Sequence, residues 1–283
     1  MLGGAAEVLG VFPGVRDRTE VRPRAAEDDC QPVAHESASL PRLSSAAVGL
    51  LAILSYHKIG PPPRGVWEPW FYVPEAMLAE QLEYLAHRGW VFVDLATALR
   101  GLSHPDLLPE RSVLVTFDDG DRSVLERALP IMAARGCPGV MFVPIVTVGR
   151  KKAFDDAGQP LDPICDWDEL RELDAGGISV QSHGVEHVAF SELEPRQIAE
   201  ELVASKAMLE EKLSKRVEAF AFPYGDGGKD PAEVTRALRT AGYTAACLYG
   251  GGPVVLPAAD RYRLSRLAIG ADTDLARELA RYL

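Results

Sequence analysis

Segments typical of strands and segments typical of helices alternate about seven times between residue 50 and the end of the chain. Short apolar runs rich in β-branched residues are followed by stretches with apolar residues at helical spacing. Neighbouring parallel strands need a crossover of a dozen or more residues, usually a helix, whereas antiparallel strands can be joined by a short turn. The alternation therefore predicts an α/β fold built on a mostly parallel sheet.

Polar residues that are unusual in a sheet end at least four of the expected strands. The expected strands cover Leu50 to Tyr56, Trp90 to Leu95, Val113 to Asp119, Val140 to Ile145, Ile178 to Ser182, Ala219 to Phe222, Ala245 to Tyr249 and Leu264 to Ile269. The residues at or just after the strand ends are His57, Asp118 with Asp119, His183 and Tyr224. Side chains from so many strands converge more easily at the mouth of a closed barrel than at the single crevice of an open doubly wound sheet, so the barrel is preferred.

The expected helices lie between these strands and also close the chain. They cover Glu75 to His87, Ala96 to Leu102, Ser123 to Arg135, Asp166 to Leu173, Arg196 to Leu213, a segment that begins at Pro231, and Asp272 to Tyr282. Several begin at proline, whose fixed φ suits the first helical turn.

The composition is that of a globular protein with a sizeable core. Among 283 residues, 47% are hydrophobic, which is ample for one large domain, expected here over residues 48–283. The net charge of −11 argues against a nucleic-acid or anionic-membrane surface, because such surfaces need clustered Lys and Arg. The four cysteines form no CxxC pair, so neither a disulfide framework nor a cysteine-type zinc site is expected.

Residues 1–47 are expected to be a disordered N-terminal extension. They carry many charges and several prolines, with no charged segment followed by the apolar core of a secretory signal. The apolar stretch Ala46 to Leu54 is too short for a transmembrane helix, which needs roughly 20 residues. These observations predict a cytoplasmic protein without an integral membrane segment, and they leave its oligomeric state open.

Asp118 and Asp119 follow a buried strand directly and precede Gly120. Successive side chains on an extended backbone point to opposite sides, so one carboxylate can bind a metal while the other handles a proton. The alternative is structural, with an aspartate that caps the following helix.

His183 and His187 lie four residues apart at the end of another expected strand. With a carboxylate from elsewhere, two imidazoles make a three-ligand site that leaves metal positions open for water and substrate, as catalytic sites do. The alternative for this spacing alone is a pair of surface histidines.

Tyr224 lies between Pro223 and Gly225, directly after an expected strand. Such a turn can present a backbone N–H to a developing oxyanion, although an ordinary turn has the same composition.

Together these motifs resemble the polysaccharide deacetylase family with the NodB homology domain, carbohydrate esterase family 4, over about residues 50 to 270. The resemblance rests on Thr116 to Gly120 (TFDDG) and Ser182 to His187 (SHGVEH), supported by Phe222 to Gly225 (FPYG). Ser55 to His57 (SYH) resembles the first strand of the branch that deacetylates exopolysaccharides of poly-N-acetylglucosamine.

The resemblance implies a deformed (β/α)7 barrel and a divalent metal ion, usually Zn²⁺, with Co²⁺ or Ni²⁺ as alternatives. Asp119, His183 and His187 would be the metal ligands. Asp118 would be the general base for a metal-activated water, and the backbone N–H of Tyr224 would stabilise the oxyanion.

Two positions depart from the common pattern of the family. No histidine follows His187, so His57 is the candidate for the general acid, as in the branch that the chain resembles. Ala221 stands where the family usually has an arginine that orients the base, and Arg266 is a candidate to supply that guanidinium, against the alternative of a surface ion pair.

The leading prediction is a hydrolase that removes N-acetyl groups from N-acetylated sugars, as a polymer, an oligosaccharide or a lipid-linked precursor. Two alternatives stay open: a metal-dependent amide or ester hydrolase acting on a small metabolite, and a non-catalytic glycan-binding relative.

Overall fold

The structure, a computed structural model, describes residues 49–66, 68–150 and 162–282. They belong to the compact unit Ala46–Leu283. The expected N-terminal extension, residues 1–47, lies outside the described residues.

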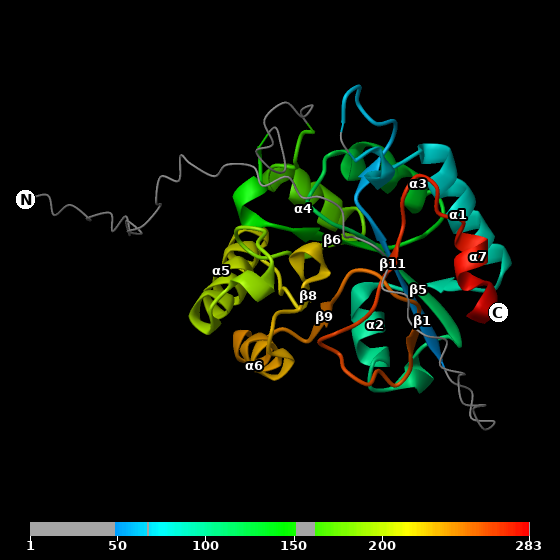
Figure 1. The fold of residues 1–283 in the computed structure, drawn as a ribbon. Helices are drawn as coiled ribbons and strands as arrows, with labels where there is room; N and C mark the ends of the chain where they lie inside the picture. Colours follow the sequence, from blue (N-terminus) through cyan, green and yellow to red (C-terminus); the bar gives the residue numbers. More distant parts are fainter. Residues whose placement is uncertain (1–48, 67, 151–161, 283) are drawn as a thin grey trace, which may run out of the picture. The chain divides into compact units, whose positions relative to one another are not determined.

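One curved sheet forms the centre of this unit (Figure 1). Its main strands are hydrogen-bonded in the order β1 (Leu50–Tyr56), β5 (Arg111–Phe117), β6 (Gly139–Val143), β7 (Ile178–Ser182), β8 (Ala219–Ala221) and β9 (Ala245–Cys247). All neighbours in this series are parallel, so their carboxyl ends lie at one end of the sheet. The short strands are β2 (Lys58–Ile59) paired with β3 (Tyr72–Val73), β4 (Val91–Phe92) beside the start of β5, β10 (Val254–Val255) antiparallel to β1, and β11 (Leu267–Ala268).

A single segment closes this sheet into a barrel. Leu264 forms a parallel bridge with Cys247 of β9, and a few residues later β11 pairs in parallel with β1. The segment from Leu264 to Ala268 therefore joins the two ends of the strand series. The closure confirms the expected deformed (β/α)7 barrel.

Helices follow the strands and lie around the sheet (Figure 1). The α-helices are α1 (Glu75–His87), α2 (Leu95–Gly101), α3 (Leu129–Ala133), α4 (Trp167–Ala175), α5 (Pro195–Leu213), α6 (Pro231–Ala241) and α7 (Leu275–Leu279). A π-helical turn, η3 (Val124–Ala128), precedes α3, and the 3-10 turns are η1 (Pro69–Phe71), η2 (Pro105–Leu107), η4 (Ile145–Thr147), η5 (Phe190–Glu192), η6 (Pro223–Gly225) and η7 (Ala280–Tyr282). No helix among the described residues is long and apolar enough to cross a membrane.

Two hydrophobic cores follow from the alternation of side chains along each strand. Leu54, Val115 and Val180 point outward and pack with the surrounding helices in the larger core. Ile53 and Leu114 point inward, into a smaller core that also contains Leu95, Ala98 and Leu102 around α2. Helix α2 therefore packs against the amino-terminal half of the barrel interior, which leaves the carboxyl end for the site.

Several expected elements are shorter than predicted, including the closing helix expected over Asp272 to Tyr282, whose α-helical part is only α7, and the strand expected over Ala245 to Tyr249, which is only β9. The strand expected over Trp90 to Leu95 is only β4, because the side chain of Asp94 accepts a hydrogen bond from the Thr97 N–H and caps α2. The strand expected over Leu264 to Ile269 is only β11, because this segment changes partner from β9 to β1. The helix expected over Ser123 to Arg135 begins as η3, and Pro130 in α3 has no N–H for a regular α-helical bond.

Candidate active site and metal centre

The inward positions of the barrel change from apolar to polar toward its carboxyl end. The apolar Leu114 of β5 is followed at alternate positions by Thr116 and then by Asp118, directly after the strand, and on β1 Ile53 is followed by Ser55. Thr116, Ser55 and Asp118 are almost fully buried. Polar groups are therefore enclosed at the end of the barrel where parallel strands present their functional residues.

Asp119, His183 and His187 form a buried cluster at this end, called the metal triad below. One ligand atom from each lies within 4.8 Å of the others. Oδ1 of Asp119 is 3.3 Å from Nε2 of His187 and 3.7 Å from Nε2 of His183. Two ligand atoms about 2.1 Å from a tetrahedral zinc ion lie about 3.4 Å apart, so the cluster has the dimensions of a zinc site.

The hydrogen bonds of the metal triad also fit a cation. Nδ1 of His183 lies 2.7 Å from the carbonyl oxygen of Ala221, which is an acceptor, so Nδ1 carries the proton and the lone pair of Nε2 faces Asp119. Burial lowers the pKa of His183 to about 4, so the ring is neutral at pH 7. Oδ1 of Asp119 is buried and has no hydrogen-bond partner among the described residues. A carboxylate oxygen and an imidazole lone pair that face each other in this way fit a cation placed between them.

Unusual backbone angles orient the side chains of two of the three ligands. Asp119 has φ 71° and His187 has φ 53°, values that side-chain-bearing residues rarely adopt. The turn at Asp119 changes the direction of its side chain relative to the strand that precedes it. Backbone strain of this kind persists only where the surrounding structure holds it, and it is common at functional sites.

Asp118 is held by a buried bidentate ion pair with Arg266. The two distances are 2.7 and 2.8 Å, and Nε of Arg266 donates to the carbonyl oxygen of Leu248 at 2.7 Å. Burial acts to raise the pKa of Asp118, but the Arg266 guanidinium and the neighbouring histidines together outweigh it and hold the pKa below its usual range. Asp118 is therefore an oriented, ionised carboxylate.

Arg266 has no exposed surface, so this ion pair is not a surface contact. Its guanidinium lies over the ring of Phe142, at 5.4 Å, inside the barrel. The inward residue of β8 at this level is Ala221, the position where an arginine was expected from the family pattern. The guanidinium comes from Arg266 on the closing segment.

His57 lies at the end of β1, with Phe71 on one side and Tyr249 on another. The centroid of its ring is 4.5 Å from that of Phe71 and 5.6 Å from that of Tyr249. Burial lowers the pKa of His57, and the nearby carboxylates of Asp119 and Asp118 act in the opposite direction. His57 therefore belongs to the same electrostatic neighbourhood as the two aspartates.

Tyr224 lies at the rim of the site. Its side chain is 69% exposed, and its ring is 4.7 Å from that of His187. Its φ of 58° lies inside η6, and Gly225 follows with φ 70°. The structure thus places all seven predicted site residues at the carboxyl end of the barrel, five of them in the two groups Asp118 with Arg266 and the metal triad.

Sequence reasoning missed three residues around this site. Phe71 and Tyr249 flank His57, and the carboxylate of Glu201 in α5 binds the loop between the two histidines of the metal triad. Tyr249 ends an expected strand, so the strand-end pattern that identified the other site residues could also have identified it. Phe71 and Glu201 lie in segments whose composition gives no indication of a site.

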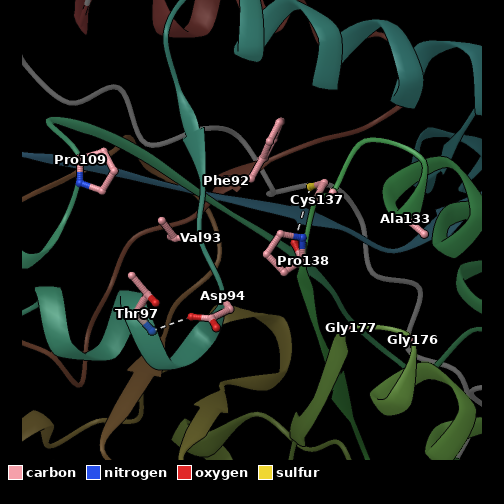
Figure 2. A pocket seen from close by; sticks show the side chains of 11 residues that line it. Phe92, Val93, Asp94, Thr97, Pro109, Ala133, Cys137, Pro138, Gly176 and Gly177 are labelled. Atoms are coloured by element: carbon pink, nitrogen blue, oxygen red, sulfur yellow. Dashed lines mark hydrogen bonds between the residues drawn. The ribbon is translucent and has the colours of Figure 1, made fainter.

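An open pocket at the other end of the barrel does not share these features (Figure 2). It is lined by residues that precede β5, β6 and β7 and by the start of α2, including Cys137 and Asp94. Burial raises the pKa of Cys137 to about 12, so the thiol is not a nucleophile at neutral pH. The carboxylate of Asp94 is engaged in capping α2.

Comparison with known proteins gives sequence relatives over part of the chain. The family model described as polysaccharide deacetylase matches residues 107–246, which include Asp118, the metal triad and Tyr224. YxkH of Bacillus subtilis is 23% identical over 68% of this chain, and poly-β-1,6-N-acetyl-D-glucosamine N-deacetylase of Escherichia coli K12 is 28% identical over 36%. The chain spans 62% of the length of YxkH and 16% of that of the E. coli protein.

Solved structures extend the similarity to most of the chain. IcaB from Ammonifex degensii is 29% identical with a TM-score of 0.68, over 83% of this chain and 97% of IcaB. The Streptococcus pyogenes deacetylase PplD also has a TM-score of 0.68, over 83% of this chain and 98% of PplD; at 20% identity, this shows a common fold. Residues 107–246 therefore form a domain of the polysaccharide deacetylase family, and the comparisons together support the NodB-homology group of carbohydrate esterase family 4.

Proposed function

We propose that this protein is a metal-dependent hydrolase that removes N-acetyl groups from sugars of an N-acetylglucosamine-containing glycan. The observation that carries the proposal is the pairing of two unlike carboxylates: Asp119 faces the imidazoles of His183 and His187, and Asp118 next to it is fixed by Arg266. One carboxylate is thus available to a cation and the other to a proton. Amide hydrolysis by an activated water needs both.

Asp119, His183 and His187 would hold the metal ion, with Zn²⁺ favoured by their mixed nitrogen and oxygen ligands and by the spacing of the triad. A bound divalent cation supplies Lewis acidity, which polarises the amide carbonyl and lowers the pKa of water from 15.7 to about 7. Three protein ligands would leave coordination positions available to substrate and water.

Asp118 would act as the general base. Its lowered pKa keeps it ionised at neutral pH, so it can accept a proton from the attacking water. The guanidinium of Arg266 fixes the plane of the carboxylate because it donates one hydrogen bond to each of the two oxygens. Ser55, whose hydroxyl lies 3.5 Å from Oδ2, is at the limit of a hydrogen bond and adds little to this orientation.

The leaving amine needs a proton, and His57 would supply it. His57 lies at the end of β1, the strand next to β5, and the charges of both aspartates act to raise its pKa. Phe71 and Tyr249 restrict the orientation of its ring. Substitution His57→Ala is expected to lower kcat by about 10²- to 10⁴-fold, the usual contribution of a general acid.

Tyr224 would contribute its backbone N–H to the oxyanion, and its exposed ring would meet the sugar. A backbone donor at the end of a rigid turn is preorganised and needs no rearrangement during the reaction. The proline before Tyr224 and the glycine after it fix that turn.

For the substrate we propose N-acetylglucosamine residues in an oligomer or polymer. The support is the similarity to the E. coli relative, whose name specifies poly-β-1,6-N-acetyl-D-glucosamine. The test is to incubate the zinc-loaded protein with β-1,6- and β-1,4-linked N-acetylglucosamine oligomers of matched length and to measure free amines and oligomer length. New amines at unchanged length are expected, with the β-1,6 series faster. Shortened oligomers, or no new amine with either series, would contradict the proposed reaction.

A further inference from the structure

The loop between the two histidines of the metal triad depends on support from outside the triad. Gly184, Val185 and Glu186 form this loop, and Gly184 has φ 84°, a conformation that glycine adopts without strain. The carbonyl oxygens of Gly184 and Val185 accept hydrogen bonds from the N–H groups of Ile145 and Val146 in η4. The carbonyl side of the loop is therefore bound to the segment that follows β6.

One carboxylate binds the N–H side of the same loop. Oε2 of Glu201 accepts hydrogen bonds from the N–H of Val185 at 2.6 Å and from the N–H of Glu186 at 3.2 Å. Glu201 belongs to α5 and is only 9% exposed. A buried carboxylate that bridges two successive backbone N–H groups is a strong, charge-assisted contact.

The fit between Glu201 and the loop is close. A Cβ atom at Gly184 would lie 2.9 Å from Oε2 of Glu201, so a larger residue there would push against the carboxylate. Glu201 is itself tied to β7, because its carbonyl oxygen accepts a hydrogen bond from the hydroxyl of Ser205, which in turn accepts one from Ser182. Helix α5 therefore fixes the position of this loop relative to β7.

We propose that Glu201 is a positioning residue of the metal triad: its carboxylate holds the loop that sets His187 relative to His183. This inference rests on the proposed function, since it assumes that the triad binds a metal. The carboxylate of Glu201 accepts hydrogen bonds from backbone N–H groups of the loop. It acts through the backbone of Val185 and Glu186, and the expected consequence of its loss is weaker metal binding.

The same helix offers a matched control. Glu210, nine residues further along α5, also accepts a hydrogen bond from a backbone N–H, that of Val217 at 2.9 Å. Val217 lies before β8, at the amino-terminal end of the barrel strands, away from the metal triad. Glu210→Ala therefore removes a similar contact from the same helix without touching the loop.

The experiment measures the zinc dissociation constant of the wild type and of Glu201→Ala, Glu201→Gln, Glu201→Asp and Glu210→Ala by competition with a chromophoric chelator, with melting temperatures alongside. Loss of an outer-shell partner typically weakens metal binding by about 10- to 100-fold, and we expect this for Glu201→Ala. Glu201→Gln keeps an acceptor oxygen and should stay within about threefold of wild type, since one oxygen can accept both N–H groups. Glu210→Ala should lower the melting temperature without changing zinc affinity.

Glu201→Asp keeps the charge but withdraws the carboxylate by one methylene, so it should weaken zinc binding even if the alanine variant does not fold. Zinc affinity within twofold of wild type in a folded Glu201→Ala or Glu201→Asp protein would overturn the proposal. Equal weakening in Glu210→Ala would also overturn it, because the effect would then be one of general stability. A wild type that binds no zinc would refute the metal site itself, and with it this inference. Zinc binding without deacetylation would count only against the proposed function.

Discussion

At the scale of single residues, the arrangement of the site depends on how two adjacent aspartates are separated in role. Asp118 continues the inward alternation of β5 and meets Arg266, whereas Asp119 turns away at φ 71° toward the two histidines. Neighbouring carboxylates at one site would repel each other if both lacked a partner. Here one is paired with a guanidinium and the other faces groups that can bind a cation with it.

The buried ion pair gives a prediction about stability and pH. Arg266→Met would leave the Asp118 carboxylate buried without a counter-charge, a change that costs about 3–5 kcal/mol. We expect such a loss in urea unfolding of the metal-free protein, together with a rise in the pKa of Asp118 that shifts the acid limb of the kcat profile to higher pH. Arg122→Met is the control, since Arg122 pairs with Glu169 at the surface and such pairs contribute about 0–1 kcal/mol. Equal destabilisation by both substitutions would contradict the assigned importance of the buried pair.

His183 gives a prediction about acid stability. Its pKa is lowered from 6.5 to about 4 in the folded protein, so between these values the unfolded chain binds a proton that the folded chain does not. Stability must therefore fall as the pH decreases from about 6.5 to about 4. Denaturant unfolding of the metal-free protein at several pH values in this range measures the slope, which should be smaller in His183→Gln. An unchanged slope in that variant would show that His183 is not buried as a neutral ring.

At the scale of elements, the site is assembled by turns at strand ends. The η6 turn is held against the end of β9: a Cβ atom at Gly225 would lie 2.7 Å from the backbone nitrogen of Tyr249. The turn that presents the Tyr224 backbone and the residue beside His57 are therefore in mutual contact. Displacement of one is expected to displace the other.

Gly225→Ala tests this contact. The added methyl group should displace η6, lower kcat by at least about tenfold through loss of the oxyanion donor, and leave zinc affinity unchanged. Gly136→Ala is the matched control, because Gly136 also has positive φ, 60°, but a Cβ atom added there would have no neighbour within 4 Å. Both variants carry the left-handed backbone cost of about 1–2 kcal/mol. If kcat falls equally in both, the contact between η6 and Tyr249 has no special role.

The sequence predicted the long strands, most helices and the strand-end residues, because alternation and helical spacing are local patterns. It did not predict how the barrel closes, because the segment from Leu264 to Ala268 changes partner within a few residues and only the assembled sheet shows this. For the same reason Arg266 could be named only as a candidate partner of Asp118. Nothing in the sequence indicated that Glu201 would contact the loop of the metal triad, because an acidic residue in an amphipathic helix is normally expected to face solvent.

At the scale of the whole molecule, the apolar core and the polar groups of the site occupy opposite ends of the barrel interior. The core around α2 fills the amino-terminal half of the interior, and the polar groups occupy the carboxyl end. The residues of the triad lie in the segments that follow β5 and β7, two strands that β6 separates in the sheet. A bound metal ion would therefore cross-link segments that lie far apart in the sequence.

This cross-link predicts that zinc stabilises the fold. A ligand that binds only the folded state at 100 times its dissociation constant adds about 2.7 kcal/mol to the free energy of unfolding. Zinc addition to chelator-treated protein should raise the melting temperature accordingly, and chelator should reverse the rise. Asp119→Ala should show no such response. A wild type whose melting temperature is indifferent to zinc would speak against the triad as a metal site.

The most direct test of the central claim is acetate release from N-acetylglucosamine oligomers by chelator-treated protein, with and without added zinc, beside zinc-loaded Asp118→Asn. We predict release only from the wild type with zinc, while the Asp118→Asn protein binds zinc with similar affinity and releases no acetate. Release without any metal, or undiminished release by the Asp118→Asn variant, would contradict the account.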